Sequence, residues 1–405
     1  MIMKIIRYIL CILALMTFTS LMVKWQFSPY VFFIKDFKKN ISIIDHSSIV
    51  NTEELTPETK NFKHHDFGSL TDLKNTKISE SIQLNNFKFD WGRIDSKKLR
   101  RVAAAELRGN YIWYINQDNE ELIRRLGLEG KITSNGGIKS IFSLSNKSYA
   151  YVTYVENDCT TARVVDLTSM KEVLQLPCLP NSENADLNGA GGGWLKLSEN
   201  TILLAIGTPT NANTDHEINQ TAQSDQSLWG KILKLSLVNE KVIVEIFSKG
   251  HRNPQGLTQI GKSILAVEQG PMGGDEINII KKGLNYGWPL QSLGSEYDLE
   301  PINKSYTKPI LTEPPLLSFV PSIAASNISK CPQMYIDYYA TNNCVAVSSL
   351  RGKSIDFIVY KNNKVLFSEK IQFNTRIRKF FVSGNTIVAV TDFKGVIIGN
   401  LKKIL

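Results

Sequence analysis

Residues 250–289 have the sequence GHRNPQGLTQIGKSILAVEQGPMGGDEINIIKKGLNYGWP. The stretch is dense in Gly, Pro and Asn, and it also carries a His, an Arg and an Asp-Glu pair. Glycine and proline fix unusual turns, which aim backbone carbonyl and amide groups at a ligand instead of at a neighbouring strand. We interpret this stretch as one wall of a ligand site.

The apolar run Leu265–Val267 inside this stretch is one of six similar runs. From about residue 81 onward, short runs rich in β-branched and aromatic residues alternate with polar turns, which is typical of an all-β protein. The other runs are Tyr111–Ile115, Tyr149–Tyr154, Leu203–Ile206, Val345–Val347 and Val388–Val390. Because each run suits one four-stranded blade, we predict a six-bladed β-propeller over residues 81–405, in preference to a pair of β-sandwiches.

The charge of the chain does not indicate a nucleic-acid partner. A net charge of +9 arises from 47 basic and 38 acidic residues, which are spread along 405 positions. The one compact basic cluster, within residues 97–101, has no aromatic platform beside it. We interpret that cluster as a solvated face and predict no nucleic-acid binding.

The N-terminus predicts export. Lys4 and Arg7 precede an apolar stretch at residues 8–23, which has the pattern of a secretory signal. We favour an uncleaved anchor over a cleaved signal peptide within residues 1–23, with the body on the periplasmic or extracellular side of the inner membrane. Residues 24–80 predict a tether or a loosely packed extension, in which His64 and His65 suit a solvated loop better than a metal site.

Four of the five cysteines form two locally spaced pairs, Cys159 with Cys178 and Cys331 with Cys344. An oxidising compartment would let both pairs close as disulfides. A metal site is the alternative, although neither pair has CxxC spacing or a nearby His.

The middle of the chain resembles the soluble pyrroloquinoline quinone (PQQ) dependent aldose sugar dehydrogenases, the glucose/sorbosone dehydrogenase family. Gly250–Leu257 resembles the family signature over eight consecutive positions, and further motifs follow in order. These are Glu268–Pro271, Gly273–Asn278 and Asn285–Pro289, with weaker matches at Trp229–Leu233, Pro321–Ala324, Ser349–Gly352 and Arg376–Arg378. The resemblance covers roughly residues 100–405.

The resemblance implies a site for PQQ, a planar trianion. Guanidinium groups clamp carboxylates in two-point fashion, and Arg376 and Arg378 would project from the same face of a strand. The implied cofactor-binding residues are Arg252, Asn253, Gln269, Arg351, Arg376 and Arg378. Surface arginines at blade edges are the alternative interpretation.

Calcium is the second implied cofactor. The family holds one ion with the backbone carbonyls that correspond to Gly270 and Pro271, and further calcium near Asp275, Glu276 and Tyr286. Capping of a turn is the alternative role for Asp275 and Glu276.

The catalytic base departs from the family pattern His-x-Gly-Gly-x-Leu. Register on Gly192, Gly193 and Leu195 places Ala190 where the His is expected, and a methyl group cannot accept a proton. His216 is a candidate substitute, with an exposed loop histidine as the alternative.

We therefore expect a PQQ- and calcium-dependent oxidoreductase that oxidises an aldose or related sugar and passes electrons to an unidentified acceptor. The alternatives are a non-catalytic propeller that binds a quinone or carbohydrate, and an interaction scaffold with an empty pocket.

Overall fold

The computed structural model describes residues 67–69, 78–108, 111–133, 135–180, 182–302 and 311–404. All of them belong to one compact unit, Thr52–Leu405. The predicted anchor at residues 8–23 and most of the predicted extension, including His64 and His65, lie outside the described residues. Within the described ranges, none of the helices combines the length and the apolar character that are needed to cross a bilayer.

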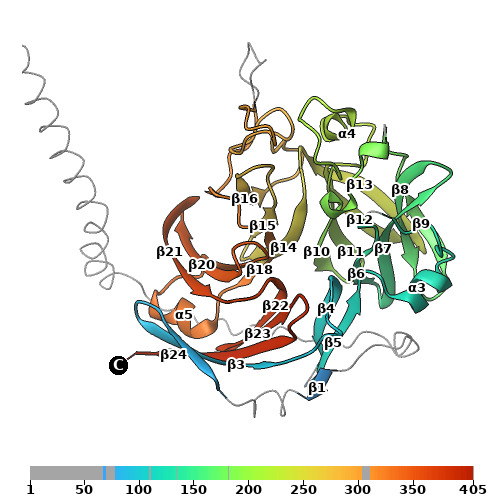
Figure 1. The fold of residues 1–405 in the computed structure, drawn as a ribbon. Coiled ribbons are helices and arrows are strands. Elements are labelled where there is room, and N and C mark those ends of the chain that lie inside the picture. The colour runs from blue at the N-terminus through green and yellow to red at the C-terminus, as the bar shows by residue number, and fades with distance from the viewer. Residues whose placement is uncertain are drawn as a thin grey trace, which may run out of the picture. The chain divides into compact units, whose positions relative to one another are not determined.

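Six antiparallel sheets account for nearly all of the described chain (Figure 1). The strands of the six sheets are β4 (Val102–Arg108), β5 (Tyr111–Asn116) and β1 (Phe67–Ser69); β6 (Gly137–Leu144), β7 (Lys147–Glu156), β8 (Cys159–Asp166) and β9 (Lys171–Gln175); β10 (Gly191–Ser198), β11 (Thr201–Ile206), β12 (Lys231–Val238) and β13 (Lys241–Lys249); β14 (Pro254–Ile260), β15 (Ser263–Glu268), β16 (Asp275–Ile280) and β17 (Leu317–Phe319); β18 (Ala325–Lys330), β19 (Cys344–Ser349), β20 (Ser354–Lys361) and β21 (Lys364–Gln372); and β22 (Ile377–Ser383), β23 (Thr386–Thr391), β24 (Val396–Lys403), β3 (Phe87–Ile94) and β2 (Glu80–Gln83). Short helices lie in the connections: α3 (Glu120–Arg125), η3 (Ser182–Asn184), η4 (Leu187–Gly189), α4 (Glu217–Gln220) and α5 (Gln333–Tyr338).

One strand of each sheet contacts the corresponding strands of two neighbouring sheets. β4 contacts β6, β6 contacts β10, and the series continues through β14 and β18 to β22, which contacts β4 again. These six inner strands surround the centre of Figure 1. The chain is therefore nearly all-β, as predicted, with its sheets linked in a ring.

Each of the six recurring apolar runs forms the second strand of a different sheet. The runs lie in β5, β7, β11, β15, β19 and β23, each of which pairs with the inner strand of its sheet. β11 and β19 are buried along nearly their whole length. A strand that is covered on both faces has no solvent side, so it is apolar without alternation, and this burial explains why the runs recur in the sequence.

Asparagine-rich pairs make several of the tight turns between strands. Ser145–Asn146, Asn157–Asp158, Asn239–Glu240 and Asn362–Asn363 all have φ values between 47° and 63°. Two consecutive residues with positive φ match the right-handed twist of the flanking strands, and Asn tolerates this conformation well.

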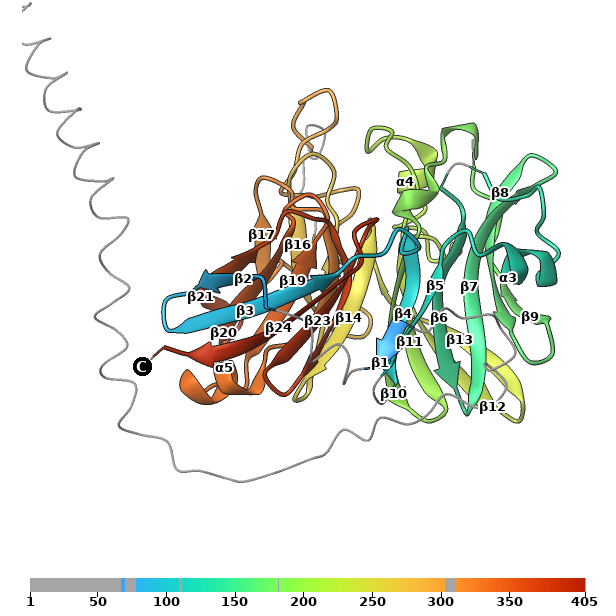
Figure 2. The same ribbon diagram turned by 60° about the horizontal axis from the view of Figure 1, so that its bottom comes forward.

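Strands from distant parts of the chain complete the last sheet. β24 pairs with β3 from Val396 opposite Ile94 to Lys403 opposite Phe87, and β2 pairs with the free edge of β3. Figure 2 shows β3 beside β24. β1 also pairs with β5, so β1 and the first residue of β2 come from the predicted extension. The division of the chain at residues 23 and 80 stays a prediction.

Buried side chains fill the space between neighbouring sheets. Between the β6–β9 and β10–β13 sheets, Tyr149 and Tyr151 pack in one cluster with Leu204 and Trp229. Burying each large apolar side chain contributes on the order of 1.5–3 kcal/mol, which makes such interfaces the main source of stability.

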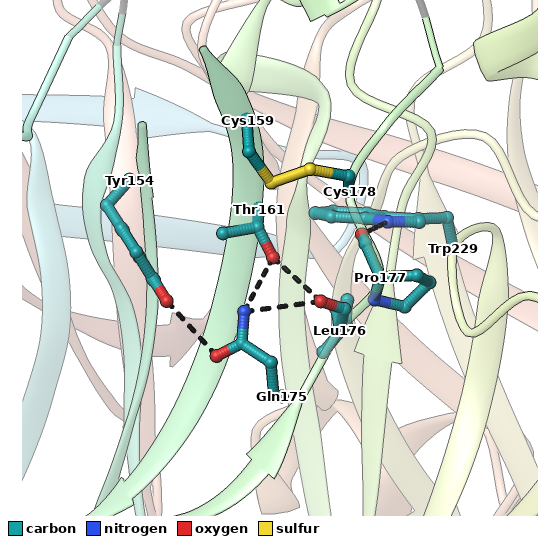
Figure 3. The surroundings of a disulfide bond; sticks show 8 residues. All are labelled: Tyr154, Cys159, Thr161, Gln175, Leu176, Pro177, Cys178 and Trp229. Carbon is teal, nitrogen blue, oxygen red and sulfur yellow. Dashed lines mark hydrogen bonds between the residues drawn. A yellow bond between two sulfur atoms is a disulfide. The ribbon is translucent and has the colours of Figure 1, made fainter. Parts of the chain in front are cut away.

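Both predicted disulfides are present. Cys331 pairs with Cys344, and Cys159 at the start of β8 pairs with Cys178 after β9. Figure 3 shows that the indole of Trp229, which precedes β12, lies beside Pro177 and donates a hydrogen bond to its carbonyl at 2.8 Å. The segment fixed by this disulfide is thus also attached to the neighbouring sheet.

Candidate functional site

The predicted site residues gather at one end of the ring. Within a sheet, the start of the inner strand and the end of its antiparallel partner coincide, as for Pro254 opposite Glu268. A Cβ on Gly193 would meet the backbone of Gly256 at 2.8 Å, and one on Gly256 would meet Asn327 at 3.1 Å, so the starts of neighbouring inner strands lie side by side. Beside these strand starts lie Ala190 before β10, Arg252 and Asn253 before β14, Gln269 after β15, Arg351 after β19, Arg376 before β22 and Arg378 within β22.

Arg252 is buried, and its guanidinium group faces the 269–270 turn. Nη1 donates to the carbonyl of Gly270 at 2.8 Å and to that of Gln269 at 3.2 Å, while Nη2 donates to the Tyr297 hydroxyl at 3.0 Å. The guanidinium carbon lies 5.3 Å from the ring of Trp288, a cation–π contact. Nε is buried without a hydrogen-bond partner among the described residues. The site therefore contains a fixed cation with one donor to spare.

Asn253 and Gln269 connect three of the inner strands. The Asn253 Oδ1 accepts a hydrogen bond from the Gly191 N–H at 3.1 Å, and Nδ2 donates to Gln269 Oε1 at 3.0 Å. The Gln269 Nε2 then donates to the carbonyl of Ala325, the first residue of β18, at 2.9 Å. These amide groups hold β10, β14 and β18 at a fixed spacing around the site.

Arg376 and Arg378 share one carboxylate that the sequence interpretation missed. Asp392 directly follows β23, and its side chain is buried. Its Oδ2 lies 2.6 Å from Arg378 Nη2 and 3.4 Å from Arg376 Nε, and its Oδ1 accepts the backbone N–H of Arg101 at 3.2 Å. A signal was present, because Asp392 lies two positions after the sixth apolar run, but nothing in the sequence linked it to the arginines.

Arg351 stands apart from the other predicted arginines. It lies in the turn after β19, its side chain is exposed, and its backbone N–H donates to the carbonyl of Ile323 at 2.9 Å.

The position of the expected base offers only a backbone carbonyl. Ala190 caps η4, and its methyl group is fully buried. Its carbonyl accepts hydrogen bonds from the Tyr151 hydroxyl at 2.9 Å and from the Gly207 N–H at 3.1 Å. Residue 190 therefore cannot take a proton from a substrate.

His216 has a structural contact of its own. It is the N-terminal cap of α4, where Nδ1 accepts the backbone N–H of Ile218 at 3.2 Å. The loop is anchored through Asn219, which binds the carbonyls of Ala212 and Asn213. The side chain is half-buried, and one ring nitrogen is thus engaged in capping.

Asp275 braces the turn that contains Gly270 and Pro271. Its Oδ1 accepts from the Gly270 N–H at 3.1 Å and from Ser322 Oγ at 2.5 Å, and Oδ2 accepts from the Ala325 N–H at 2.9 Å. Burial raises the pKa of Asp275, and these hydrogen bonds oppose that shift. Both carboxylate oxygens serve the turn, in line with the alternative capping role.

Glu276 has a different environment. It opposes the buried Glu268 across β15 and β16, and the Asn278 amide donates to both carboxylates, at 2.7 Å to Glu268 and 3.1 Å to Glu276. Burial, with the negative charges of Glu268 and Asp275, raises the pKa of Glu276 to about 8. Asn278 Oδ1 is buried without a partner among the described residues. In the described part of the chain, however, no three His, Cys, Asp or Glu side chains gather in a metal-binding group.

Tyr286 is the remaining residue predicted near calcium, and its ring packs against that of His251. Their rings stack with centroids 4.8 Å apart, and the Tyr286 hydroxyl donates to the carbonyl of Ile279 at 2.7 Å. His251 is fully buried between Ser248 Oγ at 2.9 Å and Glu268 Oε1 at 3.2 Å. These contacts hold His251 in place within the Gly250–Leu257 signature.

Lys139 is a further site residue that the sequence interpretation missed. It lies near the start of the inner strand β6, and its Nζ donates to the carbonyl of Asn135 at 2.7 Å. Burial, followed by repulsion from Arg101 and Arg378, lowers the pKa of Lys139 to about 7, although Asp186 opposes the shift. Lysines are common in any sequence, so only the folded arrangement sets this one apart.

Residues 130–398 match the glucose/sorbosone dehydrogenase family. The chain is 36% identical over 123 residues to the aldose sugar dehydrogenase YliI of Escherichia coli, and 44% identical over 87 residues to quinoprotein glucose dehydrogenase B of Acinetobacter calcoaceticus. These stretches cover 27% and 19% of this chain, and 31% and 18% of the respective relatives. The chain thus matches less than a third of the length of each of these curated relatives.

The fold is similar to that of the soluble aldose sugar dehydrogenase of Escherichia coli in its apo form. The TM-score is 0.58 with 21% identity, and the match covers 78% of this chain and 100% of the other. The family match spans residues 130–398, about two thirds of the sequence, so the chain is a member of the glucose/sorbosone dehydrogenase family.

Proposed function

We propose that this protein is a PQQ-dependent dehydrogenase that oxidises an aldose or a related sugar at the mouth of a six-bladed propeller. The observation that carries the proposal is the group of fixed cations at one end of the ring, formed by Arg252, Arg376 and Arg378. These arginines occupy the positions that resemble the family's quinone-binding motifs.

The closed series of contacts among the six inner strands supports the blade count. Each sheet would be one blade, and the last blade would be completed by β3 and β2. Propellers place their ligand sites on the axis, where the inner strands meet.

The residues present fit a polyanionic quinone. Arg252, Arg376, Arg378 and Arg101 are the cations of the mouth, and the carboxylates near them include Asp186, Asp392, Glu268 and Asp275. The unpaired Nε of Arg252 is a further sign, because a buried guanidinium donor without a partner is costly and a ligand carboxylate would satisfy it. Asn253, Gln269 and Arg351 would complete the cradle.

A hard cation also fits the wall, with one restriction. The Glu276 carboxylate lies near the negative charges of Glu268 and Asp275. Asn278, two residues further along the chain, has an amide oxygen without a hydrogen-bond partner among the described residues. Oxygen ligands of these two kinds suit calcium. The carbonyls of Gly270 and Pro271 would hold a second ion, although the Gly270 oxygen already accepts the Arg252 guanidinium. Asp275 has both oxygens engaged, so we assign it to the turn.

When bound, the quinone supplies the hydride acceptor, and calcium polarises its carbonyl oxygens. The protein then has to bind the anionic cofactor, orient the sugar and remove a hydroxyl proton. The amide chain of Asn253 and Gln269 serves the orientation, because it fixes three inner strands relative to one another.

We also propose that the protein acts outside the inner membrane, held there by residues 8–23, and that its electrons pass to a separate acceptor. The apolar N-terminal stretch and the two disulfides support this location, since disulfides persist in oxidising compartments.

The test is reconstitution of the purified full chain with PQQ and calcium. We expect a spectral change of PQQ on binding, thermal stabilisation that depends on calcium, and turnover of an artificial electron acceptor with at least one sugar of a panel. The Arg376→Ala/Arg378→Ala variant should lose these effects, whereas Arg124→Ala/Arg125→Ala on the exposed face of α3 should keep them. Turnover equal in both variants would contradict the proposal.

A non-catalytic quinone- or carbohydrate-binding protein is the second candidate. The fully buried methyl group of Ala190 favours it, since the expected base is absent. A spectral change and stabilisation without turnover would support this candidate over the dehydrogenase.

A further inference from the structure

We infer that Lys139 is the proton acceptor of this chain, taking the sugar hydroxyl proton that residue 190 cannot accept. This inference rests on the proposed dehydrogenase function and deepens it.

The position of Lys139 places it beside the expected base segment. A Cβ on Gly192 would meet the Lys139 carbonyl at 3.0 Å and the Lys139 Cβ at 3.3 Å, so the two inner strands touch at this level. The neighbouring Gly191 is bound to Asn253 through its N–H. Lys139 and Asn253 therefore flank the same pair of glycines, at positions where the close backbone of neighbouring residues leaves no room for a side chain.

A continuous hydrogen-bond network connects Lys139 to Arg252. The Lys139 Nζ donates to the Asn135 carbonyl, and the Asn135 amide donates to Asp186 Oδ1 at 3.1 Å. Asn211 Nδ2 donates to Asp186 Oδ2 at 2.6 Å, and its Oδ1 accepts from Arg252 Nη2 at 3.4 Å. Lys139 thus belongs to the same mouth as Arg252.

Lys139 is half-buried, whereas the fully buried Lys231 shows what a purely structural amine looks like in this fold. Burial lowers the pKa of Lys231 to about 7 as well, but its Nζ donates to three carbonyls, those of Thr221, Ala222 and Trp229, at 2.8 to 2.9 Å. Those three bonds use all three hydrogens of an ammonium. Among the residues that the structure describes, the Lys139 Nζ donates to one acceptor, the Asn135 carbonyl, which leaves a neutral amine its lone pair.

The charges around Lys139 suit a base that works near neutral pH. Arg101 precedes β4 and Arg378 lies in β22, and both disfavour an additional positive charge at Lys139. Asp186, before β10, would stabilise the ammonium once the proton has been taken. General bases are most effective when their pKa lies near the working pH.

The hydroxyl O–H bond of the sugar breaks and an N–H bond forms on the Lys139 amine, while the C–H bond on the same carbon gives up its hydride, with two electrons, to the oxidised quinone. The sugar carbon becomes a carbonyl carbon, and the ammonium later releases its proton to solvent.

The first test does not depend on activity. In competitive acetylation of the folded full chain, followed by mass spectrometry over a pH range, Lys139 should become reactive near pH 7. Lys171, which is exposed on β9 of the same sheet, serves as the internal reference for acetylation. Bound PQQ should protect Lys139 and not Lys171. Titration of Lys139 near 10, or no acetylation of it at any pH, would overturn the inference.

The second test separates proton transfer from binding. At pH 8.5 the Lys139→Met variant should bind PQQ within about threefold of the wild type, while kcat falls about 10²- to 10⁴-fold. Lys139→Arg, which keeps a charge but cannot act as a base, should be equally impaired. Lys171→Met should match the wild type, and Asp186→Asn should retain more activity than Lys139→Met if Asp186 only stabilises the ammonium.

Failure of the Lys139 inference can be told apart from failure of the proposed dehydrogenase function. If the wild type turns over and Lys139→Met turns over equally, only the inference about Lys139 fails. If the wild type binds no PQQ, the proposed function fails and the inference fails with it.

Discussion

The buried carboxylate of Asp392 lies 2.6 Å from Arg378 Nη2 and also contacts Arg376, so one acid orients two cations of the candidate site. Its second oxygen accepts the backbone N–H of Arg101, which precedes the neighbouring inner strand β4. A single side chain therefore sets the directions of the arginines and joins the last sheet to the first.

Replacement of this acid should weaken the site although it removes a negative charge. We expect Asp392→Asn to lower the free energy of unfolding by about 1–3 kcal/mol, because buried hydrogen-bonding groups lose their partner. PQQ affinity should also fall, since the guanidinium groups are no longer held in place. Urea unfolding and PQQ titration measure the two effects, with the exposed Glu129→Gln as the control. Tighter PQQ binding in Asp392→Asn would mean that net charge matters more than orientation.

The raised pKa of Glu276 predicts a pH dependence of stability. The folded protein holds this proton up to about pH 8, whereas the unfolded chain releases it near 4.5, so the folded state binds more protons between these values. In the presence of a chelator, wild-type stability should therefore decline as the pH rises from 4.5 to about 8. Glu276→Gln should lack this part of the decline, and added calcium should reduce it in the wild type. Superimposable pH profiles of the two proteins would exclude a role of Glu276.

The hydrogen bonds of the Trp288 indole should contribute to the free energy of unfolding, whereas the indole of Trp91 should make no such contribution. Trp288 Nε1 donates to Thr208 Oγ1 at 2.9 Å and to Asn219 Oδ1 at 3.2 Å, whereas Trp91 Nε1 is buried without a partner among the described residues. Trp288→Phe should therefore cost about 1 kcal/mol more in unfolding free energy than Trp91→Phe. Equal losses in chemical denaturation would show that the indole hydrogen bonds contribute nothing.

The disulfide between Cys159 and Cys178 should stabilise the second sheet. It closes a loop of 19 residues, for which the loss of chain entropy in the unfolded state predicts about 3 kcal/mol. Cys159→Ser/Cys178→Ser should unfold at correspondingly lower urea concentration, and unreduced wild-type protein should show no free thiol at these positions by mass spectrometry. A free thiol at either cysteine would contradict the assignment.

The fold could be predicted from the sequence because its strongest signal is local. The second strands of the sheets are buried on both faces, so runs such as Leu203–Ile206 and Val345–Val347 are apolar throughout. The sequence did not reveal which strand pairs with β24 in the last sheet. Nothing in residues 87–94 indicated that they would pair with residues 396–403, since the pairing of distant strands leaves no periodic signal.

The site was predictable only where a continuous motif carried it. Arg252 and Asn253 lie within the signature, and their position at the start of β14 follows from it. Asp392 and Lys139 belong to other strands and are common residue types, so their meaning depends on which neighbours the ring brings to them. The charge of Arg378 acts on both, and that relationship exists only in the folded chain.

The pairing of β24 with β3 has a consequence for the order of events during biosynthesis. Its register joins residues about three hundred positions apart, so β3 gains its partner only after residues 396–403 have been made. Arg376 precedes β22, Arg378 lies within it and Asp392 follows β23, so all three are made long after Arg252. A nascent chain therefore cannot present a complete set of arginines to an anionic ligand until the residues of β22 and β23 have been synthesised.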